Sequence, residues 1–293
     1  MDTSLDYVIY FVGSGLAFFV GVAAILAGLA ISLRAVGRAA AHARDLVVML
    51  GGLFVVISAA PLEWWVYAVA AALTGVWLPL EWYRNILPSR VLGASRLAVL
   101  LVWLLALALE IPFHVTPALP LLNKPTLFLV GDSVSAGILE SEKGTWPRLF
   151  AKQHDVDMRD FSKAGATVES ARKQAEKIGN GSGIVLLEIG GNDLLGTTSA
   201  EQFEEQLDLL LGDVCREDRL VVMLGLPLPP FANRFGRIQR QLARKYDVIL
   251  IPQRVFAGII TAPGATVDGI HLTPVGHQRM ADTMWTLIRS AYE

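Results

Sequence analysis

The stretch "TLFLVGDSVSAG", residues 126–137, joins a short apolar run to a turn rich in glycine and serine. The apolar half is brief and bounded by turn residues, which is typical of a buried strand in a parallel sheet. Runs of the same kind recur further along the chain as "IVLLEI" (184–189), "RLVVMLGL" (219–226) and "VILIP" (248–252). A weaker strand is expected in "VDMRDFS", residues 156–162.

Stretches with helical character separate these strands. They cover residues 146–153, 168–177, 200–213, 231–245 and 274–292. Strands that alternate with helices predict an α/β domain, in which helices cover both faces of a parallel sheet. Ligands of such sheets bind beyond the carboxyl ends of the strands.

Four stretches with chemically useful residues fall at such strand ends or in loops. They are "GDSVSAG" (131–137), "SKAGATVES" (162–170), "GGND" (190–193) and "DGIHLTPVGH" (268–277). The first three follow predicted strands and the fourth precedes the last helix. Because the ends of parallel strands gather at one edge, residues that are far apart in sequence can meet there. We therefore expect a single site.

The residue types in these stretches suit acyl transfer. A serine hydroxyl such as that of Ser133 is a poor nucleophile until a base removes its proton, and His271 can act as that base. Asp268, three residues earlier, can hold the other imidazole nitrogen. The negative charge that develops on a carbonyl oxygen needs preset donors, for which the backbone N–H groups of Ser133 and Gly165 and the side-chain amide of Asn192 are candidates.

Together, in this order and at this spacing, the four stretches resemble the conserved blocks of the SGNH, or GDSL, hydrolase family. The resemblance covers residue 125 to the C-terminus. It implies a flavodoxin-like, three-layer α/β/α fold, Ser133 as nucleophile, Asp268 and His271 as the rest of the triad, and an oxyanion hole made by Ser133, Gly165 and Asn192. Ser162 stands where many relatives carry asparagine, which we interpret as a difference beside the site and not as a loss of activity.

Other kinds of site are not indicated. The five histidines are dispersed, no phosphate-binding loop is present, and we predict neither a metal nor a cofactor. A net charge of −2 gives no sign of nucleic-acid binding. Cys215 is the single cysteine, so an intrachain disulfide is impossible. Asp132 and Asp193 are expected to bond loop backbone, and His277 to begin the packed last helix.

The first third of the chain is different in character. The whole sequence is 53% hydrophobic and only 18% charged, with a mean hydropathy of +0.48, and no lysine precedes Lys124. Four apolar segments are candidate membrane spans: 7–33, 46–60, 64–80 and 97–113. The second and third are short and are expected to form a tight helical hairpin. Buried core helices of a soluble protein are the alternative.

These segments predict a transmembrane region of about four helices at residues 1–113, a linker at 114–124 and a hydrolase domain at 125–293. Arginines fall in the first and third loops between the segments. They are Arg34, Arg38 and Arg44, then Arg84, Arg90 and Arg96. The positive-inside rule therefore predicts a multi-pass membrane protein whose N-terminus and hydrolase domain lie outside the cytoplasm.

The predicted helix at 231–245 carries an apolar stripe and a basic one. The stripes are Phe231, Phe235, Ile238 and Leu242, and Arg234, Arg237, Arg240 and Arg244. A basic stripe is usually a solvated face; beside a membrane it is also suited to anionic lipid head groups or an anionic glycan.

The sequence thus predicts a membrane-anchored serine esterase that hydrolyses or transfers an acyl group. A lipid or lysophospholipid ester is the first candidate substrate, and an acetyl ester of an exported polysaccharide or cell-wall glycan is the second. A membrane binding or transport protein with a silent hydrolase domain is a hypothesis of another class. Membrane lipids are expected around the N-terminal helices, and the sequence leaves protein partners open.

Overall fold

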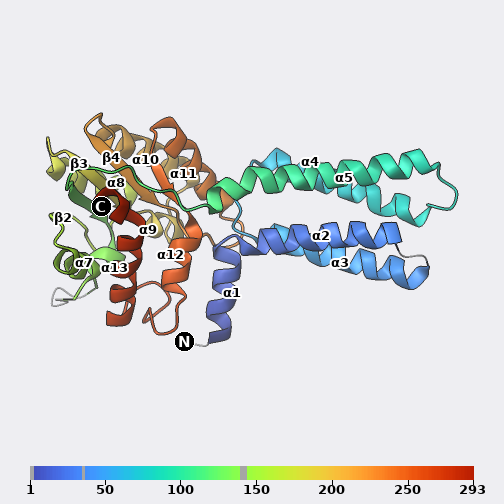
Figure 1. Cartoon of the computed structure of the whole chain (residues 1–293), viewed down its shortest axis with the longest axis horizontal. Helices are drawn as coiled ribbons and strands as arrows, with labels where there is room; N and C mark the ends of the chain where they lie inside the picture. The colour runs from blue at the N-terminus through green and yellow to red at the C-terminus, as the bar shows by residue number, and fades with distance from the viewer. Residues whose placement is uncertain (1–2, 35–36, 139–143) are drawn as a thin grey trace.

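The computed structural model describes residues 3–34, 37–138 and 144–293. An α/β domain lies at one end of a long helical region that residues 3–114 build (Figure 1). The strands are β1 (Thr126–Gly131), β2 (Met158–Asp160), β3 (Gly183–Glu188), β4 (Arg219–Leu224) and β5 (Ile249–Ile251). They form one parallel sheet in the order β2-β1-β3-β4-β5. This order is that of flavodoxin-like sheets, so the predicted fold class is confirmed.

Helices cover both faces of the sheet. The α/β domain contains α6 (Ser133–Ala136), α7 (Trp146–His154), α8 (Val168–Ala175), α9 (Gly191–Leu195), α10 (Ala200–Val214), α11 (Asn233–Lys245), α12 (Gln253–Ile260) and α13 (Pro274–Ile288), with short 3₁₀ turns at Glu176–Ile178 and Arg289–Ala291. The sequence predicted five of them and missed α12 and the short helices α6 and α9. Where α8, α10 and α13 begin, the side-chain hydroxyls of Thr167, Ser199 and Thr273 respectively accept hydrogen bonds from backbone N–H groups of the first turn.

Alternate strand residues point into two separate cores. Phe128 and Val185 belong to the core beneath α8, α10 and α11, whereas Leu129 and Leu186 belong to the core beneath α7, α12 and α13. Leu129 and Leu186 are also direct partners in the register of β1 and β3. Since both faces are buried, the strands read as continuous apolar runs, as the sequence suggested.

The helical region comprises α1 (Thr3–Gly13), α2 (Leu16–Arg34), α3 (Arg38–Ile57), α4 (Trp64–Trp82) and α5 (Ser89–Glu110), followed by a 3₁₀ turn at Ile111–His114. Among the residues that the structure describes, three helices are long and apolar enough to cross a membrane: Leu16–Arg34, Arg38–Ile57 and Ser89–His114. This finding suggests membrane association. The helix α4 is similar in length but is not one of the three.

The prediction of one span over residues 7–33 is wrong. The chain turns at Ser14 and Gly15, where Gly15 adopts a left-handed φ of 84°. As a result α1 runs across the direction of α2 to α5 (Figure 1) and packs against α12 of the α/β domain. Hydropathy does not distinguish an apolar helix that packs on a domain from one that crosses a bilayer.

The expected hairpin of the second and third segments is also wrong. The principal contacts pair α2 with α3 and α4 with α5. Glycines let the backbones of α2 and α3 approach: a Cβ at Gly51 would lie 2.6 Å from the carbonyl oxygen of Gly21, and a Cβ at Gly21 equally close to that of Gly51. Small residues at a helix crossing are a common device of membrane helices.

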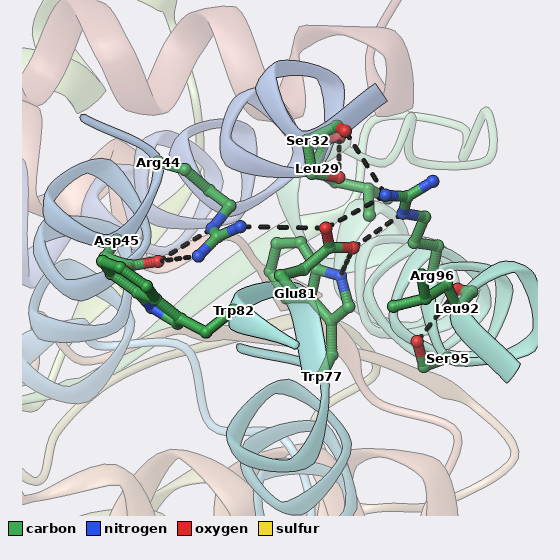
Figure 2. A network of polar contacts seen from close by, with 10 residues as sticks. All are labelled: Leu29, Ser32, Arg44, Asp45, Trp77, Glu81, Trp82, Leu92, Ser95 and Arg96. Carbon is green, nitrogen blue, oxygen red and sulfur yellow. Dashed lines mark hydrogen bonds and ion pairs between the residues drawn. The ribbon is translucent and has the colours of Figure 1, made fainter. Parts of the chain in front are cut away.

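Buried charges join the helices near the end of the bundle that is remote from the α/β domain (Figure 2). Arg96 donates to both carboxylate oxygens of Glu81, at 2.7 and 3.0 Å, and Trp77 adds a third hydrogen bond at 2.8 Å. Arg44 lies 3.7 Å from Glu81 and 2.7 Å from Asp45. Arg44 belongs to α3 and Arg96 to α5. Their prediction as loop residues is therefore wrong.

The α/β domain docks on the other end of the bundle through α11. Both guanidinium nitrogens of Arg240 bond the Glu110 carboxylate at 2.7 Å, with both side chains buried. Arg237 and Asn233 donate to the carbonyl oxygens of Leu62 and Ser58. For Arg240 the interpretation of a solvated basic face is wrong, because this face of α11 contacts the helical region.

Gly51→Ala is expected to destabilise the bundle, because its new methyl group would press on the backbone of α2. Gly52→Ala is the matched control, since a Cβ at that neighbouring position meets no atom within 4 Å. Thermal unfolding of the full chain in mild detergent should show a lower Tm for Gly51→Ala and an unchanged or higher Tm for Gly52→Ala, where alanine favours the helix by up to about 1 kcal/mol. Equal shifts in the two variants would contradict the close crossing.

Candidate active site

Ser133 lies at the junction of β1 and α6, buried at the carboxyl edge of the sheet. The preceding Asp132 accepts a hydrogen bond from the backbone N–H of Val134 at 2.9 Å, which fixes the turn. Burial raises the pKa of Asp132 to about 6. Asp132 therefore has the backbone-bonding role that its place in the sequence suggested. Asp193, whose carboxylate accepts the N–H of Val168 at 2.9 Å, has the same kind of role.

Two contacts join His271 to Asp268 in the loop before α13. Asp268 accepts the backbone N–H of His271 at 2.9 Å through one oxygen and contacts its ring Nδ1 at 2.6 Å through the other. The hydrogen bond from His271 lowers the pKa of Asp268 to about 2. A carboxylate can only accept, so the neutral imidazole carries its hydrogen on Nδ1 and keeps Nε2 free to act as a base.

The candidate oxyanion donors Asn192 and Gly165 lie on different elements of the α/β domain. Asn192, in α9, donates its side-chain amide to the carbonyl oxygen of Ala166 at 2.9 Å and lies 3.5 Å from Asp132. Gly165 sits in the loop after β2 with a left-handed φ of 74°, and no atom would contact a Cβ there within 4 Å. Its conformation therefore explains why glycine occupies this position.

A cavity of about 320 Å³ brings most of the candidate residues together. Ser133, Asn192 and His271 line it, Asp268 supports His271 from outside, and Gly165 is not among the lining residues. The remaining lining is almost entirely apolar. It consists of Ile9, Val12 and Gly13 of α1, Leu194 and Leu195 of α9, residues 226–230 after β4, Phe256 and Ile260 of α12, Val134, Ile270, and the polar or small residues Asp132, Glu188 and Gly191.

A hydrogen-bonded chain lies directly behind the turn that carries Ser133. The indole N–H of Trp146 donates to the hydroxyl of Ser135 at 3.1 Å, and that hydroxyl donates to Glu188 at 2.6 Å. Burial raises the pKa of Glu188 well above its ordinary value, so it keeps its proton to a higher pH than an exposed glutamate does. Glu188 was not predicted from the sequence, although a lone acid at the end of an apolar strand was a usable signal.

The last helix behaves as predicted at His277. Its imidazole is buried, and Nδ1 accepts the backbone N–H of Trp146 at 3.2 Å. His277 therefore fastens α13 to the start of α7. Within residues 3–34, 37–138 and 144–293, no group of three or more acidic, histidine or cysteine side chains could hold a metal ion.

Comparison with known proteins identifies the family of the α/β domain. Residues 129–279 match the sequence profile of the GDSL-like Lipase/Acylhydrolase family. The chain belongs to this family. It is an SGNH-type enzyme that hydrolyses esters, as the four sequence stretches indicated.

Individual relatives agree with this assignment. Over 178 residues, 56% of this chain and 88% of the relative, the chain is 26% identical to Esterase TesA of Pseudomonas aeruginosa. Over 168 residues, 54% of this chain and 81% of the relative, it is 30% identical to Thioesterase 1/protease 1/lysophospholipase L1 of Escherichia coli. The solved esterase EstA of Pseudoalteromonas sp. shares the fold, with a TM-score of 0.50 at 19% identity over 56% of this chain and 97% of EstA.

The state of Glu188 can be tested by exchange for its neutral isostere. Glu188→Gln preserves an acceptor for Ser135 and should change the Tm little near pH 4. Because the folded-state pKa of Glu188 is raised, the wild type loses stability as pH increases above the unfolded value of about 4.3. The glutamine variant lacks this loss, so its advantage in Tm should grow toward pH 8.

Glu188→Ala is the contrasting variant. It removes the acceptor of Ser135 and leaves a cavity, so we expect it to be about 2–4 kcal/mol less stable than Glu188→Gln at every pH. Thermal unfolding of both variants between pH 4 and pH 8 makes the comparison. An alanine variant as stable as the glutamine variant would show that the hydrogen-bonded chain is not needed.

Proposed function

We propose that this protein is a membrane-anchored serine esterase in which Ser133, His271 and Asp268 form the catalytic triad. One observation carries the proposal: Ser133 and His271 line the same cavity, and Asp268 holds His271 with Nδ1 as the donor. Because its pKa is about 2, Asp268 stays ionised through the whole physiological range and stabilises the imidazolium that forms during the reaction.

The reaction follows from these positions. His271 Nε2 takes the proton of Ser133 as Oγ bonds the ester carbonyl carbon, and the carbonyl oxygen becomes an oxyanion. The backbone N–H of Ser133 and the amide of Asn192 stabilise that charge, and the resemblance to the family adds the N–H of Gly165 as a third donor; loss of one such donor typically costs about 10²–10³ in rate. The imidazolium then protonates the leaving alcohol. Water, activated by the same imidazole, releases the acid from Ser133.

Two observations bear on the substrate. Its lining is apolar except around the proposed catalytic residues, which suits the hydrocarbon part of a lipid or lysophospholipid ester. The names of the relatives include both esterase and lysophospholipase, in agreement with such a substrate. An acetyl ester of an exported glycan, the second candidate, would leave most of this apolar surface unused.

The anchoring part of the proposal is supported by the arrangement of the helices. Since α4 packs along α5, a candidate span, we count α2 to α5 as four passes, and α1 and the α/β domain lie at the same end (Figure 1). The arginines near the helix ends, including Arg34, Arg38, Arg84 and Arg90, fall toward the other end. By the positive-inside rule that end faces the cytoplasm, so the hydrolase domain lies outside it.

Labelling with a serine-reactive fluorophosphonate tests the nucleophile. The wild type in mild detergent should label, and Ser133→Ala should lose the label completely. Ser290→Ala is the control. This serine lies near the C-terminus, its hydroxyl donates to the carbonyl oxygen of Leu119, and it does not line the cavity. Ser135 is unsuitable as a control, since its hydroxyl belongs to the chain behind the site.

Two outcomes would contradict the proposal. One is a wild type that fails to label while a known serine hydrolase labels in the same detergent. The other is a Ser133→Ala variant that keeps the label, which would place the reactive group elsewhere.

A further inference from the structure

The apolar helix α1 forms part of the cavity that contains Ser133. Ile9, Val12 and Gly13 lie along its second half and line the cavity together with residues from the α/β domain. A Cβ at Gly13 would lie 3.6 Å from the carbonyl oxygen of Leu228, which shows how closely α1 approaches the loop after β4. The helix α1 therefore supplies part of the wall of a cavity whose candidate catalytic residues belong to the α/β domain.

The position of α1 is fixed by polar contacts at its end. The backbone N–H of Ala59 donates to the carbonyl oxygen of Val12 at 3.2 Å, and the ring of His114 contacts the carbonyl oxygen of Ser14 at 3.2 Å. The left-handed Gly15 then lets the chain turn into α2. Further along α1, a Cβ at Gly258 of α12 would lie 3.6 Å from the ring of Tyr10. These contacts make α1 a fixed wall of the cavity.

The residues beside α1 in the cavity lining are also apolar. They include Leu226, Pro227 and Leu228 after β4, and Phe256 and Ile260 of α12. A cavity of 320 Å³ lies in the range of ordinary ligand sites. Each methylene group of a hydrocarbon that moves from water into such a lining strengthens binding about fourfold, so the site favours long chains over acetyl groups.

The first half of α1 carries exposed apolar side chains. Leu5, Tyr7 and Val8 are 53%, 75% and 58% exposed. In Figure 1 α1 lies where the bundle meets the α/β domain and crosses the direction of the bundle helices. If the bundle crosses a membrane, α1 lies along the membrane surface with these exposed side chains toward the lipid, as interfacial helices do. Because the candidate membrane helices follow α1 directly in the chain, we take lipid to cover these side chains.

We infer that α1 is the acyl-chain wall of the active site, and that the substrate is an ester whose hydrocarbon chain enters from the adjoining membrane. The inference rests on the proposed function, since it assigns a substrate class to the same Ser133. It adds a specificity determinant, Ile9, that lies outside the residues matched by the family.

Chain-length preference tests the wall. The full chain in mild detergent is assayed with p-nitrophenyl acetate, octanoate and palmitate. Ile9→Trp fills the cavity and should lower the ratio of long-chain to acetate kcat/KM by about tenfold or more. Val8→Trp is the matched control: this neighbour is exposed and does not line the cavity, so its ratio should equal that of the wild type.

A second variant guards against a folding defect. Gly13→Val also adds bulk to the cavity wall and should shift the ratio in the same direction as Ile9→Trp. An unchanged ratio in a variant with wild-type acetate hydrolysis would overturn the inference while leaving the proposed function intact. If the wild type hydrolyses none of the esters, or if Ser133→Ala hydrolyses them all, the proposed function itself fails.

Surface dilution tests entry from the membrane. The protein is reconstituted in phosphatidylcholine vesicles at increasing ratios of lipid to p-nitrophenyl palmitate. If the ester enters from the bilayer, the palmitate rate should fall as lipid dilutes the ester in the membrane, while the rate with water-soluble p-nitrophenyl acetate stays constant. A palmitate rate that does not respond to added lipid would overturn entry from the membrane.

Discussion

The buried ion pair between Arg240 and Glu110 holds the two parts of the molecule in one arrangement. Both oxygens of Glu110 are occupied by the guanidinium, which also stacks on the ring of Phe113 at 3.8 Å from its centre. Removal of either partner would leave the other charge buried without compensation, which is strongly unfavourable. Contacts of the guanidinium of Arg254 with the carbonyl oxygen of His114 and the hydroxyl of Thr116 reinforce the same junction.

The active-site cavity depends on this fixed junction. Ser133 and His271 belong to the α/β domain, whereas Ile9 and Val12 come from a helix that precedes the bundle. A loose tether between the parts would leave the apolar floor of the cavity open to water. Because the ion pair fixes the orientation, the helical region that we propose as a membrane anchor also contributes to the cavity, and an enzyme of this family can carry a wall that its catalytic domain does not encode.

The local chemistry of the site was predictable from the sequence. Asp268 and His271 lie three residues apart in one loop, so their contact requires only a turn, and Ser133 follows a strand whose apolar run is unmistakable. Asp132 and His277 also have their expected structural roles. The roles of Ser133, Asp268, His271, Asn192 and Gly165 in catalysis stay predictions.

Long-range packing was not predictable in the same way. Arg240 looked like a solvated residue because its partner, Glu110, is 130 positions earlier. The turn at Gly15 was invisible to hydropathy, which reads residues 7–33 as one apolar run although its first part packs on α12. Glu188 was overlooked because a buried acid is compatible with an apolar strand only when partners such as Ser135, distant in sequence, are known.

A structure of the full chain after reaction with a long-chain alkyl fluorophosphonate tests the central claim most directly. We expect phosphorus bonded to Ser133 Oγ, with the alkyl chain lying against Ile9 and Val12 of α1. Phosphorus on another side chain would contradict the assignment of the nucleophile. An alkyl chain that leaves the cavity without touching α1 would contradict the joint construction of the site.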